Sequence, residues 1–138
     1  MSTSPQGILL FAHGARDPAW AQPFERAASL LRARAPAGEH TPHVVELAFL
    51  EFMTPDLLTA GHTLVQAGCR SVTVVPLFLG AGGHVRKDLP RLMGELQAQH
   101  PQVSWQLSAA VGETDALIQA LADAAWTLAQ PQTTTTDT

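Results

Sequence analysis

Two histidines follow apolar runs of this 138-residue chain, and a glutamate lies inside a third run. His13 ends the segment "LLFAH", and His84 follows the glycine-rich segment "LFLGAGG". Glu46 interrupts the run "VVELAF", where an unpaired carboxylate would be costly because it loses its hydration. It must therefore be paired, protonated or bound to a cation. Two neutral imidazoles and a carboxylate suit a borderline divalent metal such as Co²⁺, Fe²⁺, Ni²⁺ or Zn²⁺.

Each of these signals also has a plain structural interpretation. A single histidine at a strand end is more often a turn residue than a ligand, and Asp17 is better explained as a helix N-cap. Glu51, at the end of the run that contains Glu46, is either a solvated strand end or the functional carboxylate in place of Glu46. The segment "GAGG" is a turn or a phosphate cradle, but it lacks the lysine and hydroxyl of a P-loop and the spacing of a dinucleotide motif. The remaining histidines show no such convergence and are interpreted as solvated surface: His40, His43, His62 and His100.

The elements that must position the candidate residues are four short apolar runs that alternate with four stretches of helical spacing. The runs cover residues 7–12, 44–50, 71–79 and 103–109. The second and third runs are apolar on both alternating faces, as strands covered on both sides should be. This alternation predicts parallel strands joined by right-handed crossovers. The expected fold is α/β: a small open parallel four-stranded sheet with helices on both faces, flavodoxin-like in the broad sense.

The helical stretches carry start and stop signals. Asp17 and Thr54 each precede a proline, the pattern of an N-cap before a proline at the first helical position. Gly68 is the expected stop of the second helix, and Pro90 means that the third helix starts just before it or is kinked there. Thr114 is the expected cap of the fourth helix. That helix carries the stripe Leu117, Ile118, Leu121, Ala125 and Leu128.

Composition and charge narrow the class of protein. Hydrophobic residues make up 46% of the chain and charged ones 14%, which predicts one globular domain over residues 1–129 and a flexible tail over 130–138. The net charge of −4 argues against a nucleic-acid or anionic-membrane partner. The single Cys69 excludes an intrachain disulfide and favours the reducing cytoplasm. The start "MSTSPQG" is unlike a signal peptide, and the apolar runs are too short to span a membrane.

The predicted topology brings the candidate residues together. In an open parallel sheet, ligands bind in the crevice outside the carboxyl ends of the strands. His13 follows the first strand and His84 the third, while Glu46 belongs to the second. We therefore expect two histidines and a carboxylate at one edge of the sheet, and a helix start at His84 would keep its ring neutral for metal ligation.

Three segments together resemble a known family. "LLFAHGARDPAW", "VELAFLEFMTPDL" and "VTVVPLFLGAGGHVRKDLP" are similar, in this order and spacing, to the short-form sirohydrochlorin chelatases, class II metal chelatases of cobalamin and siroheme biosynthesis. Longer members carry two such domains in tandem, and this chain resembles one half. The resemblance implies insertion of Co²⁺, or in relatives Fe²⁺ or Ni²⁺, into the tetrapyrrole sirohydrochlorin without ATP and without an organic cofactor.

The resemblance also implies roles for particular residues. The metal-binding and catalytic histidines of the family map onto His13 and His84, and the carboxylate used with them maps best onto Glu46. Ala15 stands where a small hydroxyl residue is common. Because the substrate is an apolar ring that carries many carboxylates, substrate-binding residues are expected among nearby cations and in the glycine-rich loop. These are Arg16, Leu79, Gly82, Gly83, Arg86 and Lys87.

Two other functions remain open at this point. A non-enzymatic carrier of metal or tetrapyrrole would use the same ligands, and turnover distinguishes the two. A histidine-phosphatase-like enzyme is disfavoured, because Ala12 stands where those enzymes have an arginine. A half-length domain also leaves its crevice open on one side, which predicts a homodimer with two facing crevices. Phe52, Met53 and Trp126 are the candidate interface residues.

Overall fold

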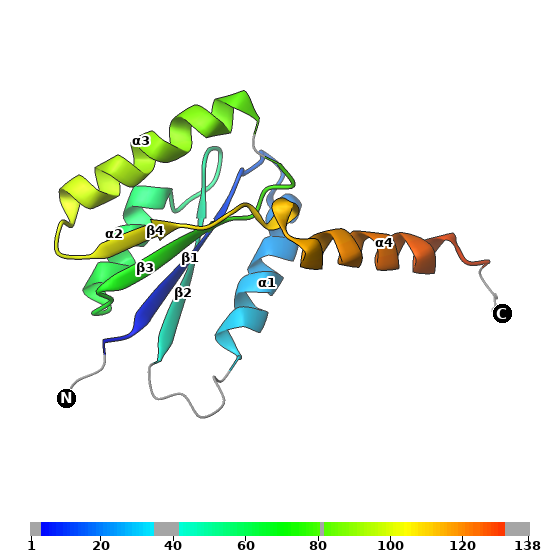
Figure 1. The fold of residues 1–138 in the computed structure, drawn as a ribbon, viewed down its shortest axis with the longest axis horizontal. Coiled ribbons are helices and arrows are strands. Elements are labelled where there is room, and N and C mark those ends of the chain that lie inside the picture. Colours follow the sequence, from blue (N-terminus) through cyan, green and yellow to red (C-terminus); the bar gives the residue numbers. More distant parts are fainter. Residues whose placement is uncertain (1–3, 35–41, 81, 132–138) are drawn as a thin grey trace.

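The computed structural model describes residues 4–34, 42–80 and 82–131, and its centre is one parallel sheet (Figure 1). The four strands lie in the order β2-β1-β3-β4, and all neighbouring pairs are parallel. The predicted α/β architecture is therefore confirmed. The strands are β1 (Gln6–Ala12), β2 (His43–Phe49), β3 (Ser71–Pro76) and β4 (Ser104–Leu107).

Helices cover both faces of this sheet. Figure 1 shows α2 and α3 on one side and α1 on the other, while α4 extends away from the sheet. Two short 3₁₀ helices, η1 and η2, precede α1 and α4. The bounds are η1 (Pro18–Ala21), α1 (Gln22–Arg32), α2 (Leu57–Gln66), α3 (Gly83–Gln99), η2 (Val111–Glu113) and α4 (Asp115–Ala129).

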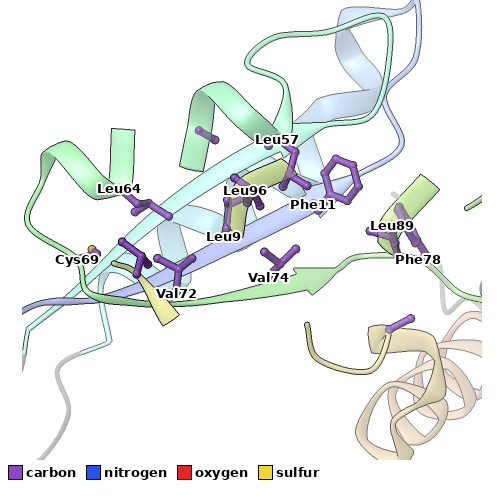
Figure 2. Close-up of a cluster of buried hydrophobic side chains, with 14 residues drawn as sticks. Leu9, Phe11, Leu57, Leu64, Cys69, Val72, Val74, Phe78, Leu89 and Leu96 are labelled. Atoms are coloured by element: carbon purple, nitrogen blue, oxygen red, sulfur yellow. The ribbon is translucent and has the colours of Figure 1, made fainter. Parts of the chain in front are cut away.

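One hydrophobic core lies on each side of the sheet, because successive side chains of each strand point to opposite faces. Leu9 and Phe11 of β1 pack with α2 and α3, in the cluster that Figure 2 shows. Leu10 and Ala12 point to the other face and pack with α1. The same cluster contains Val45, Leu47 and Phe49 of β2. Full burial of such large side chains stabilises the fold by roughly 1.5–3 kcal/mol each. These cores make the sheet a rigid base for the loops that follow its strands.

The helix signals in the sequence are only partly correct. Asp17 is an N-cap, but it caps η1, where its Oδ1 accepts from the Ala19 N–H at 3.0 Å. The prediction that Thr54 caps the second helix is wrong. The Pro55 carbonyl accepts from the Phe49 N–H at 2.9 Å, so this dipeptide belongs to the loop that returns to β2. Asp56 is the N-cap of α2.

Two further signals concern helix ends. Gly68 follows α2 with a positive φ of 95°, so its predicted role as the stop is confirmed. Of the two alternatives for the third helix, a start just before Pro90 is wrong, since α3 already begins at Gly83. Pro90 lies exposed in the helix interior, where its missing N–H removes one helix hydrogen bond.

The C-terminal helix is capped as expected but is not packed as a core helix. The Thr114 Oγ1 accepts from the Leu117 N–H at 3.3 Å. None of the residues Asp115–Ala129, all of which the structure describes, is buried. Residues 132–138 of the predicted tail lie outside the described residues. Within the described ranges, no helix is both long and apolar enough to cross a membrane.

The N-cap of α2 makes stability depend on pH. Hydrogen bonds from the backbone and side chain of Thr59 lower the pKa of Asp56 below its ordinary value. We expect Asp56→Ala to lower the free energy of unfolding by about 1 kcal/mol at pH 7. Because the pKa of Asp56 is lower in the folded chain than in the unfolded chain, its ionised carboxylate stabilises the fold at pH values above its ordinary pKa of about 3.9. This stabilisation is lost as the pH falls through the lowered pKa. Urea unfolding at pH 7 and pH 3 measures both effects.

Asp56→Asn is the matched control for this cap. It keeps an accepting oxygen but cannot ionise, so its stability should approach that of the unaltered chain in acid. An unchanged urea midpoint for Asp56→Ala at pH 7 would contradict the assignment of Asp56 as the cap.

Candidate active site

His13 lies at the carboxyl edge of the sheet, directly after β1. Its ring is half-buried, and its centroid lies 4.4 Å from that of Phe78, which follows β3. Phe78 itself is buried and also packs against Phe11 of β1. The imidazole therefore rests on an apolar base that is shared by the ends of β1 and β3.

The loop after β2 is held against the same histidine. The Leu50 N–H donates to the Ala12 carbonyl at 2.9 Å, and the Glu51 N–H donates to the His13 carbonyl at 3.0 Å. These bonds extend the β1–β2 pairing beyond both strands. Gly14 permits the approach, because it has a φ of +95° and a Cβ there would lie 1.8 Å from the Glu51 carbonyl oxygen. Glu51 is therefore a neighbour of His13.

Arg16 connects the loops that follow β1 and β2. Its Cζ lies 4.5 Å from the centroid of the Phe52 ring, the geometry of a cation–π contact. Phe52 adopts a positive φ of 68° and is 56% exposed. This contact keeps a guanidinium at the edge that carries His13, where it can meet a substrate carboxylate.

The segment after β3 completes this edge. Leu79 is 70% exposed, and Gly82 is the N-cap of α3. A Cβ on Gly82 would meet nothing within 4 Å, so packing does not require this glycine. Gly83 and His84 are the first two residues of α3, and Lys87 is exposed. The side chains of residues 83–86, which include His84 and Arg86, lie outside the part of the chain that the structure describes.

Glu46 is not brought to His13. It lies in the middle of β2, opposite Leu9, and is half-buried. Three residues separate it from the strand end, a distance of about 10 Å at the usual rise of a strand. It lines a cavity of about 270 Å³ together with Glu25 and Arg32 of α1. The carboxylate whose backbone is next to His13 is that of Glu51, the alternative to Glu46 that the sequence left open.

Within the described residues, no group of three His, Cys, Asp or Glu side chains could hold a metal ion. The predicted ligand set includes His84, whose side chain is outside that part of the chain. Described residues line two cavities at the same edge, one of about 140 Å³ beside Leu57 and one of about 230 Å³ beside Phe78. Both are smaller than the roughly 300–1,000 Å³ of typical ligand pockets, so a large ligand needs the open crevice as well.

The family model of CbiX matches residues 7–127. This chain belongs to the CbiX family. The three segments that carry the sequence resemblance all lie within that match, and the structure places the ends of β1, β2 and β3 in them at one edge of the sheet. The family resemblance seen in the sequence is confirmed.

Solved structures support the CbiX fold. A structure assigned to cobalamin (vitamin B12) biosynthesis as CbiX, from Marinobacter aquaeolei VT8, is 32% identical with a TM-score of 0.73, covering 90% of this chain and 97% of that one. The sirohydrochlorin chelatase SirB from Bacillus subtilis subspecies spizizenii, in complex with cobalt, is 24% identical with a TM-score of 0.74. This chain covers 51% of SirB, so the CbiX fold here matches about half of the longer chain.

Curated relatives carry the name sirohydrochlorin cobaltochelatase. The protein of Saccharolobus islandicus strain L.S.2.15 is 35% identical over 88 residues, which are 64% of this chain and 63% of the relative. That of Sulfurisphaera tokodaii is 32% identical over 91 residues, 66% of this chain and 70% of the relative. The match thus spans less than two thirds of the length of the Saccharolobus islandicus protein.

Proposed function

We propose that this CbiX-family chain inserts a divalent metal into sirohydrochlorin without ATP. The observation that carries the proposal is the position of His13, whose ring rests on Phe78 at the carboxyl edge while its carbonyl accepts from Glu51. Open parallel sheets bind their ligands at this edge. The names of the curated relatives supply the reaction and the tetrapyrrole.

The chemistry needs a metal ligand and acceptors for protons. When M²⁺ enters the ring, the two pyrrole N–H protons leave, so the charge of the ring is unchanged by the exchange. We propose that His13 and His84 hold the incoming ion as neutral imidazoles and that a carboxylate beside them takes up a proton. Once the ion has passed to the ring, an imidazole lone pair is free again and can accept the second proton, and both protons then pass to solvent.

The substrate carboxylates call for cations in an otherwise acidic chain. Arg16 is held at the edge by Phe52, and Lys87 is exposed on α3. We propose that these two residues and Arg86 bind the carboxylates, while Leu79 and the glycines 82 and 83 leave room for the face of the ring. Bidentate contacts from arginine to carboxylate are the strongest of these interactions.

Co²⁺ is the metal we propose, because the curated relatives are named cobaltochelatases. Fe²⁺ and Ni²⁺ suit the same imidazole and carboxylate donors and are the alternatives. The predicted place in cobalamin or siroheme biosynthesis and the predicted cytoplasmic location are part of this proposal. Cys69 is a buried free cysteine, in keeping with a reducing compartment.

Turnover tests the proposal against the carrier alternative. Sirohydrochlorin is incubated anaerobically with Co²⁺, Fe²⁺ or Ni²⁺ and a substoichiometric amount of the chain, and the absorption spectrum of the ring is followed. A chelatase metallates many equivalents of sirohydrochlorin faster than the uncatalysed reaction. Saturation at one equivalent of ring or metal per chain would establish a carrier and overturn the enzymatic proposal.

The two candidate carboxylates are separated by a matched pair of variants. Because Glu51 is next to His13 and Glu46 lies about 10 Å back along β2, the structure supports Glu51 better than the sequence-based choice. We expect Glu51→Gln to lower turnover about 10-fold or more and Glu46→Gln to change it less than about 2-fold. Circular dichroism checks that both variants are folded. A larger loss of turnover in Glu46→Gln than in Glu51→Gln would instead assign the proton-accepting role to Glu46.

The proposed homodimer follows from the openness of the site. The two cavities that described residues line at the carboxyl edge are each smaller than a typical ligand pocket, and a second copy facing this edge would enclose the macrocycle. Of the predicted interface residues, Phe52 and Trp126 are exposed, at 56% and 72%. Met53 instead packs against the core under α1.

A further inference from the structure

Two histidines that the sequence indicated as separate, solvated surface residues lie together in the structure. His62 is exposed on α2, and His100 is the C-cap of α3. Their ring centroids are 5.5 Å apart, and the ring planes are inclined by 31°. The pair is remote from the candidate active site, because α3 begins at the carboxyl edge and its 17 residues run for about 25 Å before His100. The proposed chelatase chemistry uses neither residue.

One ring nitrogen of this pair is buried and unpartnered. The Nε2 of His100 has no hydrogen-bond partner among the described residues. A buried polar atom without a partner is uncommon in native structures, and a bound ion is one of the few arrangements that account for it. A neutral imidazole carries a lone pair on one nitrogen, so Nε2 can serve as a metal ligand. His62 forms no hydrogen bond within the described ranges, so its exposed ring can turn a nitrogen toward the same ion.

The backbone around His100 is held in place by three hydrogen bonds. Its N–H donates to the Leu96 carbonyl at 2.9 Å. Its carbonyl accepts from the Val103 N–H at 3.1 Å and from the Trp105 Nε1 at 3.2 Å. Gly61 allows α2 to approach the same corner closely, since an added Cβ would lie 2.6 Å from the Leu96 side chain. This close approach puts the neighbouring histidine of α2 beside a ring whose backbone is already fixed.

The separation of the two rings fits a shared metal ion. An ion bound at about 2.1 Å to one nitrogen of each ring, with a tetrahedral angle between the bonds, puts the two centroids roughly 5.2 Å apart. The observed separation of 5.5 Å is close to this value. Furthermore, the ion would lie at the C-terminal end of α3, where the last carbonyls carry partial negative charge and the last turn holds no basic residue. Geometry and electrostatics therefore both favour a cation between the rings.

We propose that His62 and His100 bind a divalent ion such as Zn²⁺, Ni²⁺ or Co²⁺ at a second site, separate from the carboxyl edge. Imidazole nitrogen suits these ions, whereas Mg²⁺ and Ca²⁺ prefer oxygen ligands. No third His, Cys, Asp or Glu side chain in the described part of the chain joins the pair, so water fills the remaining positions of the ion. The ion links α2 to the end of α3. This site does not depend on the proposed chelatase activity.

NMR of the histidine rings tests the site in the full chain. The chain, labelled with ¹⁵N in its histidines, is titrated with Zn²⁺, and Mg²⁺ serves as the control ion. Single His→Ala variants assign the ring signals. We expect the ring nitrogens of His62 and His100 to shift together, with the same apparent Kd, and Mg²⁺ to shift neither. Ring signals of His100 that do not move in a large excess of Zn²⁺ would overturn the inference.

His62→Ala removes one of the two ligands and should leave the fold intact, because His62 is exposed. We expect the Zn²⁺ affinity reported by His100 to fall at least about 10-fold, since loss of even an outer-shell partner of a metal ligand costs that much. His43→Ala is the matched control and should leave this affinity unchanged, because the His43 ring lies beside the Leu31 carbonyl. Circular dichroism checks both variants. Undiminished affinity at His100 in His62→Ala would mean that the two rings share no ion.

The same titration distinguishes this site from the proposed catalytic one. His13→Ala and His84→Ala should leave the paired shifts of His62 and His100 in place. Loss of these shifts in either variant would make the pair part of the catalytic site and overturn the inference. A chain that shows the paired shifts but metallates no sirohydrochlorin would refute the proposed function and support the second site.

Discussion

Replacing His13 with alanine is expected to lower the turnover of sirohydrochlorin metallation by about 100-fold or more while the chain stays folded. The imidazole lies at the carboxyl edge, and its ring is half-buried on Phe78. It makes one ring contact with the core, so its loss leaves the two hydrophobic cores in place. His84→Ala is expected to have the same effect, because its backbone lies in the first turn of α3 at the same edge. Initial rates under anaerobic conditions measure both variants.

His62→Ala is the matched control for the loss of an imidazole. His62 is exposed on α2, and its ring neighbours His100 rather than any residue at the carboxyl edge. Its removal should leave turnover within about 2-fold. Free imidazole should partly restore His13→Ala, because the vacated space over Phe78 can admit the same ring. Near-normal turnover in His13→Ala with unchanged circular dichroism would refute its assignment as a metal ligand.

The sequence predicted those elements whose signals are local. Short continuous apolar runs predicted the strands, and adjacent residues such as Leu9 and Leu10 point into different cores. Thr114 was predicted as a cap because its hydroxyl needs only the backbone that follows it. Thr54 was also predicted as a cap, but it is not one, because the Pro55 carbonyl accepts from the Phe49 N–H of β2. That contact follows from the fold and not from neighbouring residues.

The order of the strands explains why the sequence favoured Glu46 over Glu51 as the functional carboxylate. Burial of Glu46 in an apolar run suggested a functional partner, because a carboxylate enclosed on both sides is costly. The order β2-β1-β3-β4 puts β2 at the edge of the sheet, where Glu46 keeps contact with solvent. The sequence offered Glu51 as the alternative to Glu46, and its backbone hydrogen bond to His13, which joins two segments far apart in the sequence, now favours it. Hydrophobic periodicity carries no information on either point.

For the fourth helix, too, the sequence predicted the element but not how it packs. The stripe around Leu121 predicts a helix with one apolar face, and the structure contains that helix. Periodicity does not say whether that face packs on the domain's own sheet, and here it does not, since no residue of α4 is buried. That depends on the direction set by η2, where Gly112 lies against Leu79.

The variant expected to affect stability most is Gly14→Ala. Gly14 has a φ of +95°, and an added Cβ would lie 1.8 Å from the Glu51 carbonyl oxygen. This atom belongs to the backbone and cannot move aside as a flexible side chain would. We expect a loss of about 3 kcal/mol or more in the free energy of unfolding, the sum of left-handed strain and displacement of the loop. Turnover should fall too, because the loop holds Glu51 beside His13.

Gly68→Ala measures the left-handed strain alone. Gly68 has the same φ of +95°, but its added Cβ would be 3.8 Å from the nearest atom, on Pro5. It should cost about 1–2 kcal/mol and leave turnover unchanged, because Gly68 ends α2 away from the carboxyl edge. Urea unfolding of both variants isolates the contact between Gly14 and Glu51. If Gly14→Ala costs no more than Gly68→Ala, the loop after β2 is not held against His13, and the case for Glu51 as the proton acceptor fails with it.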